Sequence, residues 1–322
     1  MRFYRRAAAA VLAAGVLSSP VLLSGTSNAT SDHRQSDRSR PRVYTLTNPE
    51  HGNPEGITFD PQTRSFYTGS VNDGTIYRGR LNDPLVRPFI PQTGTSSVGM
   101  HERRGVLFVA GGTTGSIRLY SIAARRQIAS FNTGRGGFIN DLVITGDGDV
   151  YATDSVRPFI WHVTARQVRA GSGTPEGIPV GSSIPFDTTP GVFNLNGIVA
   201  LNDQTLVVVQ TNTGNFYRIA LNNSRRRGAA PAIQQVRGLN VVGGDGLLLD
   251  RGRLVVVTGT PTPRLVFADL RNEGRTGRVE RIQTDPNLRG PSTVDAAENR
   301  YLVVNADFGG PPPFTIASLP RH

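Results

Sequence analysis

Short apolar runs alternate along the chain with clusters of turn-forming residues. LVVVQ at 206–210 and RLVVVTG at 253–259 are examples, and stretches rich in Asp, Gly and Asn separate such runs from each other. Short runs rich in β-branched residues and bounded by turn signals are typical of strands. The pattern therefore predicts an all-β fold built from many short strands.

The same succession of strands and turns occurs six times. The repeats begin PEGITFD at 54, SVGMHER at 97, INDLVIT at 139, LNGIVAL at 195, GDGLLLD at 244 and PSTVDAA at 291. An anchor residue, usually Gly, falls at 56, 99, 141, 197, 246 and 293, with spacings of 43, 42, 56, 49 and 47 residues. Periods in the forties with three or four strands per unit indicate propeller blades. We therefore predict a six-bladed β-propeller over 43–322, in which VYTLT at 43–47 is the outer strand of the last blade and closes the ring.

The residue before each anchor forms a second column with its own chemistry. This column holds Glu55, Val98, Asn140, Asn196, Asp245 and Ser292. Equivalent positions of successive blades lie on a ring around a propeller's central channel, so four oxygen-bearing side chains are expected to converge there. Two carboxylates and two carboxamides match Ca²⁺ best, with Mg²⁺, Mn²⁺ or Zn²⁺ as alternatives. The competing interpretation is that Asn and Asp before Gly only form turns.

Four of these motifs resemble segments of a known family. PEGI at 54–57, IND at 139–141, LNGI at 195–198 and GDG at 244–246 are similar to motifs of the family of senescence marker protein, gluconolactonase and luciferin-regenerating enzyme. The resemblance covers about residues 43–320 and extends more distantly to paraoxonases and diisopropylfluorophosphatase. It implies a calcium-dependent six-bladed propeller that hydrolyses lactones or similar esters, in which the metal polarises the carbonyl and stabilises the oxyanion.

The resemblance also implies roles for individual residues. Glu55, Asn196 and Asp245 match the core metal ligands, and Asn140 matches an asparagine that binds metal or substrate. Asp245 is the implied catalytic base or nucleophile. His101 is expected near the same mouth, where histidines of paraoxonase-like enzymes take part in catalysis. The alternative for His101 is an ordinary polar surface position.

One position departs from the family pattern. Sugar-lactone enzymes of the family usually carry an arginine two residues before the third-blade asparagine, and Phe138 stands there instead. An apolar mouth favours a less polar ligand than a sugar, and we expect Phe138, Asn140 and His101 to contact the substrate. The departure keeps a second hypothesis open, a non-catalytic extracellular propeller that binds a small molecule, a glycan or a protein around a structural metal.

The letters PEGI recur at 175–178, outside the column. Glu176 lies 35 residues after the third anchor, in a connection rich in Gly, Ser and Pro. We therefore expect Glu55 to be a metal ligand and Glu176 to be a solvated residue of the rim.

The first 29 residues predict a secretory signal peptide. MRFYRR is a basic start, an apolar core follows, and SNA at 27–29 supplies small residues for cleavage. Arg5 and Arg6 also permit a twin-arginine route, and the interrupted apolar core argues against a retained membrane span. A disordered polar spacer is predicted at 30–42. The mature protein is therefore expected to be extracellular and to lack a transmembrane segment.

Composition excludes several classes of function. All 35 basic residues are arginine and the formal net charge is +11, but the charges are scattered without interleaved aromatic residues, so we expect no nucleic-acid partner. Cysteine is absent, which excludes thiol catalysis, iron–sulfur clusters and zinc–cysteine sites. The predicted partner is a small-molecule lactone or ester, and the sequence leaves the oligomeric state open.

Overall fold

The structure, a computed structural model, describes residues 40–48, 52–221 and 231–321. The predicted signal peptide and most of the predicted spacer lie outside these ranges. From Arg40 onward the chain forms one compact unit. Its described residues contain 24 strands and one short helix, α2 (Ala165–Ala170), and none of their helices is long and apolar enough to cross a membrane. The prediction of an all-β fold is confirmed.

The strands follow the repeats along the chain. They are β1 (Val43–Leu46), β2 (Pro54–Asp60), β3 (Ser65–Ser70), β4 (Ile76–Arg80), β5 (Asp83–Ile90), β6 (Met100–Arg103), β7 (Val106–Ala110), β8 (Ser116–Ser121), β9 (Arg126–Asn132), β10 (Ile139–Ile144), β11 (Val150–Asp154), β12 (Phe159–Val163), β13 (Glu176–Pro179), β14 (Leu195–Asn202), β15 (Thr205–Gln210), β16 (Asn215–Ala220), β17 (Ala232–Asn240), β18 (Gly244–Asp250), β19 (Arg253–Thr258), β20 (Arg264–Arg271), β21 (Thr276–Gln283), β22 (Pro291–Ala297), β23 (Arg300–Asn305) and β24 (Thr315–Pro320).

Hydrogen bonds join these strands into two eight-stranded and two four-stranded sheets. The four-stranded sheets are β6–β9 and β10–β13. Each eight-stranded sheet contains one parallel pairing, β1 with β5 or β17 with β21, which joins two antiparallel sets of four strands. We call each antiparallel set of four strands a run. The runs of the larger sheets are β2–β5, β22–β24 with β1, β14–β17 and β18–β21.

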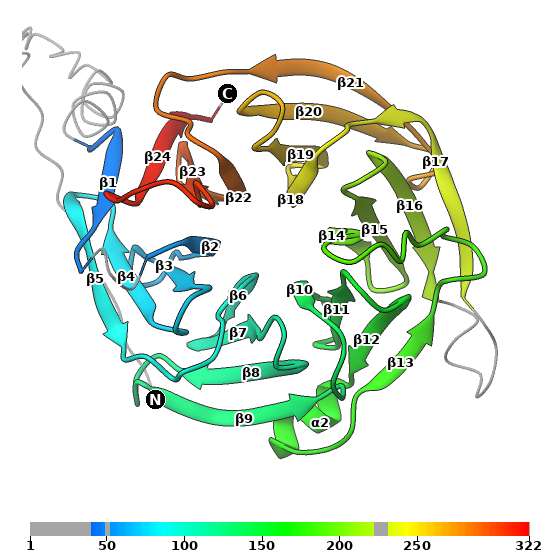
Figure 1. The fold of residues 1–322 in the computed structure, drawn as a ribbon, viewed down its shortest axis with the longest axis horizontal. Coiled ribbons are helices and arrows are strands. Elements are labelled where there is room, and N and C mark those ends of the chain that lie inside the picture. Colours follow the sequence, from blue (N-terminus) through cyan, green and yellow to red (C-terminus); the bar gives the residue numbers. More distant parts are fainter. Residues whose placement is uncertain (1–39, 49–51, 222–230, 322) are drawn as a thin grey trace, which may run out of the picture. The chain divides into compact units, whose positions relative to one another are not determined.

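The runs surround a common centre, with one strand of each run nearest to it (Figure 1). These inner strands are β2, β6, β10, β14, β18 and β22. Each contacts the next in that order, and β22 contacts β2 again. The contacts of the inner strands therefore form a closed ring, and the start of every predicted repeat lies at its inner edge.

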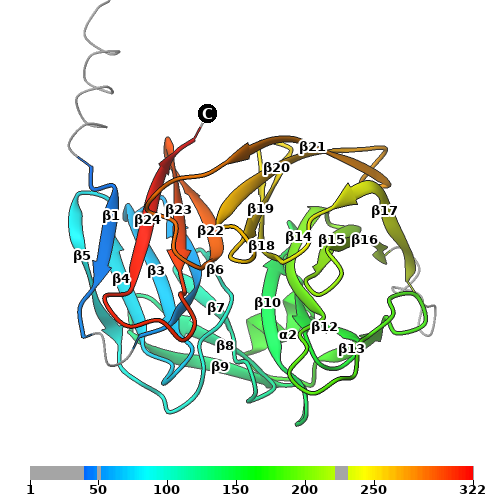
Figure 2. The same ribbon diagram turned by 45° about the horizontal axis from the view of Figure 1, so that its top comes forward.

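The first and last described strands close this ring together. Strand β1 lies beside β24 (Figure 2), with Val43 opposite Ala317 and Thr45 opposite Thr315. Tyr44 is fully buried, and its hydroxyl donates to the carbonyl oxygen of Leu81 at 2.9 Å. The prediction that 43–47 pairs as the outer strand of the last set is confirmed.

Apolar side chains fill the space between neighbouring runs. Ile160 and Ile198 belong to one such cluster, between β10–β13 and β14–β17, and similar clusters fill the other five boundaries. Every residue of β3, β15 and β23 is buried. These second strands are covered on both faces, which explains why their apolar residues are continuous rather than alternating.

The anchor glycines lie where the backbones of neighbouring inner strands approach most closely. A Cβ atom added to Gly56 would lie 2.3 Å from the carbonyl oxygen of Val98. One added to Gly197 would lie 2.4 Å from the carbonyl oxygen of Asp245. Because real Cβ contacts are longer, Gly56 and Gly197 are required where these strands approach each other.

Side chains bridge the same boundaries where the anchor is not glycine. The Asp141 carboxylate accepts hydrogen bonds from the backbone N–H groups of Leu142 at 2.8 Å and Ile198 at 3.2 Å. Beside the sixth anchor, the hydroxyl of Ser292 donates to the carbonyl oxygen of Glu55 at 2.9 Å. The inner ring is thus joined by direct contacts between neighbouring repeats.

Candidate functional site

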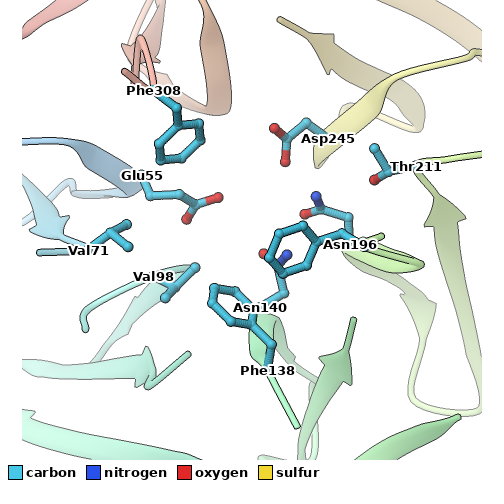
Figure 3. A pocket seen from close by; sticks show the side chains of 10 residues that line it. Glu55, Val71, Val98, Phe138, Asn140, Asn196, Thr211, Asp245 and Phe308 are labelled. Atoms are coloured by element: carbon cyan, nitrogen blue, oxygen red, sulfur yellow. The ribbon is translucent and has the colours of Figure 1, made fainter. Parts of the chain in front are cut away.

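A pocket of about 400 Å³ opens at the end of the ring where the inner strands begin. Its polar lining residues are Glu55, Asn140, Asn196, Thr211 and Asp245, and its apolar lining residues are Val71, Val98, Phe138, Phe193 and Phe308 (Figure 3). Residues of all six repeats line the pocket, and the sixth repeat is represented by Phe308, which follows its second strand. The pocket is therefore formed by the whole ring and not by any single run.

The four oxygen-bearing residues of the predicted column converge in this pocket. Glu55, Asn140, Asn196 and Asp245 lie at the starts of β2, β10, β14 and β18, and Figure 3 shows their polar groups directed toward one another. Glu55, Asn140 and Asn196 are buried, whereas Asp245 is half-buried. The phase within the repeat thus placed all four side chains correctly.

Two oxygen atoms at this point are buried without a hydrogen-bond partner among the described residues, Oε2 of Glu55 and Oδ1 of Asn140. The other end of the Asn140 amide is occupied, because Nδ2 donates to the hydroxyl of Ser155 at 2.9 Å. The Ser155 hydroxyl donates in turn to the carbonyl oxygen of Leu195 at 2.5 Å. Buried acceptors without a donor cost about 1–3 kcal/mol each. Oε2 and Oδ1 are therefore suited to a ligand that supplies positive charge or a donor.

Burial raises the pKa values of the carboxyl groups around the pocket, and neighbouring carboxylates add to this for Glu55 and Asp245. Burial raises the pKa of Glu55 well above its usual range, and the charges of Asp245 and Asp141 raise it further. Burial, with a contribution from Asp141, raises the pKa of Asp245 to about 7. Burial also raises the pKa of Asp141 to about 7. A positive charge among these groups would favour their ionised forms.

The donor set fits a hard divalent cation. Carboxylate and carboxamide oxygens are the ligands that Ca²⁺ takes in proteins, and two carboxylates balance its charge. In the described ranges no group of three or more His, Cys, Asp or Glu side chains is arranged to hold a metal ion. A cation in this pocket would therefore use the carboxamides of Asn140 and Asn196 together with Glu55 and Asp245.

Aromatic side chains form much of the pocket's walls. Phe138 precedes β10 and lies at the mouth as predicted, and its ring meets that of Phe193 edge to face with 4.8 Å between centroids. Phe193 belongs to the connection between β13 and β14, and Phe308 to that between β23 and β24. Phe193 is 43% exposed and Phe308 is 62% exposed. The site therefore combines a polar floor with an apolar, partly open entrance.

His101 lies away from this pocket. It belongs to β6, three residues beyond Val98 and opposite Phe108 of β7. Three residues of strand advance the chain by about 10 Å. Val98 lines the pocket, and His101 does not belong to the described residues that line it. The expectation that His101 contacts the substrate is thus not met by its position, and burial lowers its pKa to about 4.

The second PEGI segment lies on the rim. Glu176 starts β13, the outermost strand of its run, and its side chain is 71% exposed. Its carboxylate lies 3.8 Å from Nδ1 of His162. The prediction that Glu55 and Glu176 occupy different environments is confirmed.

The site residues predicted from the sequence did not include Ser155 or the lining residues Val71, Phe193, Thr211 and Phe308. A signal existed for Ser155. It ends the TDS segment at 153–155, and β11 pairs antiparallel with β10, Ile139 opposite Asp154. The end of a second strand therefore lies beside the start of its inner strand. Phe193 and Phe308 belong to connections of unequal length, so they have no equivalent positions in the other repeats from which their place could be predicted.

A ring of antiparallel runs around a central pocket is the architecture of a β-propeller. Solved structures of this class are similar in fold, although no protein-family model and no curated protein sequence matches the chain. The WD40 β-propeller domain of Doa1 is similar with a TM-score of 0.53 and 10% identity, over 82% of this chain and 78% of that domain.

A gluconolactonase from Xanthomonas campestris is also similar in fold. The TM-score is 0.58 and the identity 18%, over 88% of this chain and 93% of the other. The chain therefore has a β-propeller fold like that of a gluconolactonase.

Proposed function

We propose that this protein is a six-bladed propeller hydrolase that opens lactones or related esters around a divalent cation, with Ca²⁺ as the first choice. The six antiparallel runs support the number of blades. The single observation that carries the metal is the pair of buried, unpartnered oxygens, Oε2 of Glu55 and Oδ1 of Asn140, in one pocket with Asn196 and Asp245. The reaction class is proposed from the likeness in fold to a gluconolactonase.

The polar residues have distinct tasks in this proposal. Glu55, Asn140, Asn196 and Asp245 hold the cation through side-chain oxygens, and the cation supplies the charge that polarises a carbonyl group. Asp245 is the more exposed of the two carboxylates, and it accepts the proton of the attacking water at a carboxylate oxygen. Ser155 holds the amide of Asn140 so that Oδ1 keeps its place.

The first experiment is metal analysis of the purified mature protein, followed by a panel of lactones and aryl esters with and without chelator. We expect one equivalent of Ca²⁺ or a similar ion to bind, and hydrolysis to stop when it is removed. Glu55→Gln should lose both properties. Glu176→Gln is the matched control, because it changes the same residue in the same four letters on the solvated rim.

The outcomes separate the two hypotheses. Failure of any divalent ion to bind would refute the metal site. If metal binds but Asp245→Asn changes no hydrolysis, the enzyme is refuted and a binding module remains. The exposed rings of Phe193 and Phe308 support that second candidate, a non-catalytic extracellular propeller, because aromatic rings can bind a ligand without cleaving it.

Export is a separate proposal, because residues 1–29 lie outside the described ranges. Mass spectrometry of protein recovered from the culture medium should find a chain that begins at Thr30. Recovery of only the uncleaved chain from cells would contradict export.

A further inference from the structure

The walls of the pocket differ in chemistry and in origin from its floor. The four oxygen-bearing residues come from the starts of inner strands, whereas Val71, Phe193 and Phe308 come from segments that connect strands. Phe138 directly precedes the third repeat and Phe308 belongs to the sixth, and Figure 3 shows them on opposite sides of the Glu55 carboxylate. A ligand that reaches the floor must therefore pass between aromatic rings.

In the proposed function the cation takes the free acceptors of the floor, Oε2 of Glu55 and Oδ1 of Asn140, and few other polar groups remain for a hydroxylated ligand. The hydroxyl of Thr211 already donates to the carbonyl oxygen of Gly244 at 2.7 Å. The amide N–H of Asn140 is held by Ser155. Sugar hydroxyl groups placed against the rings above would lose water without gaining partners, which a binding site penalises strongly.

We propose that the ligand of this site carries an apolar arm, an alkyl chain or an aryl ring, that lies between Phe308 and the Phe138–Phe193 pair while its carbonyl group faces the four oxygens. This inference rests on the proposed function for the identity of the reacting group. Phe193 and Phe308 determine specificity, because their exposed ring faces become buried when the arm binds.

Three δ-lactones with the same ring test the proposal: δ-valerolactone without an arm, δ-decalactone with an alkyl arm, and glucono-δ-lactone with hydroxyl groups. The kcat/KM value should be highest for δ-decalactone and lowest for glucono-δ-lactone, mainly through KM. Phe308→Ala and Phe193→Ala should each lower kcat/KM for δ-decalactone by about tenfold, since each removes most of one buried ring face. Both variants should lower kcat/KM for δ-valerolactone by a clearly smaller factor, because this lactone has no arm to bury against the rings.

Ile282→Ala is the matched control, because Ile282 is an apolar residue of β21 with 51% exposure that does not line the pocket. Equal or faster hydrolysis of glucono-δ-lactone, or unchanged kinetics of both phenylalanine variants with δ-decalactone, would overturn the apolar arm while leaving the hydrolase intact.

If no lactone is hydrolysed, the proposed function fails and calorimetry decides the inference. The lactam analogue of δ-decalactone should bind at least tenfold more tightly than the same lactam without its alkyl arm, and Phe308→Ala should abolish the difference. Equal affinities of the two lactams for the wild-type protein would overturn the inference.

Discussion

Ser155 illustrates how a residue without a chemical role of its own can define a site. Its hydroxyl receives the N–H of Asn140 and donates to the backbone of Leu195 in the next repeat. The amide of Asn140 is thereby kept in one orientation, and its Oδ1 stays free in the pocket that Glu55 also lines. The position of Asn140 Oδ1 thus depends on the hydrogen bond from Ser155 to Leu195, which joins two repeats.

Ser155→Ala should therefore lower both stability and cation affinity. The free energy of unfolding should fall by about 1–3 kcal/mol, because a buried N–H and a buried carbonyl group lose partners. Ca²⁺ affinity measured by calorimetry should fall at least fivefold, because the Asn140 amide can rotate. Ser130→Ala on the exposed side of β9 is the control. Unchanged affinity in Ser155→Ala would show that Asn140 does not depend on Ser155.

The oxygen-bearing residues of the site were easier to predict from the sequence than the residues around them. The column before the anchors located Glu55, Asn140, Asn196 and Asp245, because every repeat reaches the inner edge of the ring in the same phase. His101 was expected at the mouth from the resemblance to paraoxonase-like enzymes and not from the column, and three residues along a strand carry its side chain well away from Val98. Ser155 required knowledge of which strand ends lie side by side.

At the scale of the elements, neighbouring inner strands are held by contacts that leave no room for a side chain. Gly197 faces the backbone of Asp245 and Leu247, and Gly56 faces that of Val98 and Gly99. These contacts explain why the anchor column is mostly glycine without an unusual backbone angle. The starts of the inner strands, and the oxygen donors they carry, are fixed relative to each other as a result.

Gly197→Ala should be destabilising by about 2 kcal/mol, because the added methyl group forces β14 and β18 apart. Denaturant unfolding would measure the loss. Gly181→Ala is the milder comparison, since its nearest neighbours are side-chain atoms of Pro158 at 3.1 and 3.4 Å. A Gly197→Ala protein as stable as Gly181→Ala would show that the inner strands can separate freely.

Strand β1 is short, and its stability contribution rests on few residues. Tyr44 is fully buried between its own run and β2–β5, and it packs edge to face on Phe66 at 4.9 Å. Tyr44→Ala should cost about 3–5 kcal/mol, the range for large-to-small changes of a buried aromatic residue. Tyr44→Phe keeps the ring, removes the hydroxyl that bonds Leu81, and should cost about 1 kcal/mol. Equal losses in the two variants by thermal unfolding would contradict this division.

The elements themselves were predictable to different degrees. Turn clusters and β-branched runs located the first three strands of each repeat, because those strands share the same sequence pattern. The two parallel pairings, β1 with β5 and β17 with β21, were not predicted. They depend on how closely the outer edges of neighbouring runs approach, and no local pattern encodes that distance.

For the whole molecule, side-chain bonds link the last described segment to the fifth repeat. Asp250 at the end of β18 accepts hydrogen bonds from Tyr301 at 2.6 Å and from Arg321, which follows β24. Burial opposes ionisation of Asp250, but the bonds from Arg321 and Tyr301 lower its pKa below the usual value. The last segment of the described chain is thus tied to a run other than its own.

Stability should therefore depend on pH through Asp250. Its folded pKa is lowered, so its stabilising contribution is complete above the unfolded pKa of about 3.9 and is lost as pH falls through the folded value. Asp250→Asn should cost about 3 kcal/mol near neutral pH, and the difference from wild type should shrink at lower pH. Arg321→Gln should behave in the same way. A wild-type advantage that persists unchanged into strong acid would exclude this origin.

A cation bound in the pocket should stabilise the folded protein, because its ligands come from four different repeats. Ligands that bind only the folded state raise the melting temperature in proportion to the logarithm of their concentration. Millimolar Ca²⁺ should therefore raise the Tm of the wild-type protein and of Glu176→Gln, but not that of Glu55→Gln. A rise of the same size in Glu55→Gln would place the stabilising cation elsewhere.

The divided origin of the pocket has a consequence for how such a protein can evolve. Its oxygen donors belong to strands that backbone contacts hold in place, whereas Phe193 and Phe308 belong to connections that differ in length from repeat to repeat. Mutations in those connections can exchange one preferred ligand for another at little cost to folding. The architecture therefore lets the walls of the pocket diversify among descendants while its oxygen donors are inherited intact.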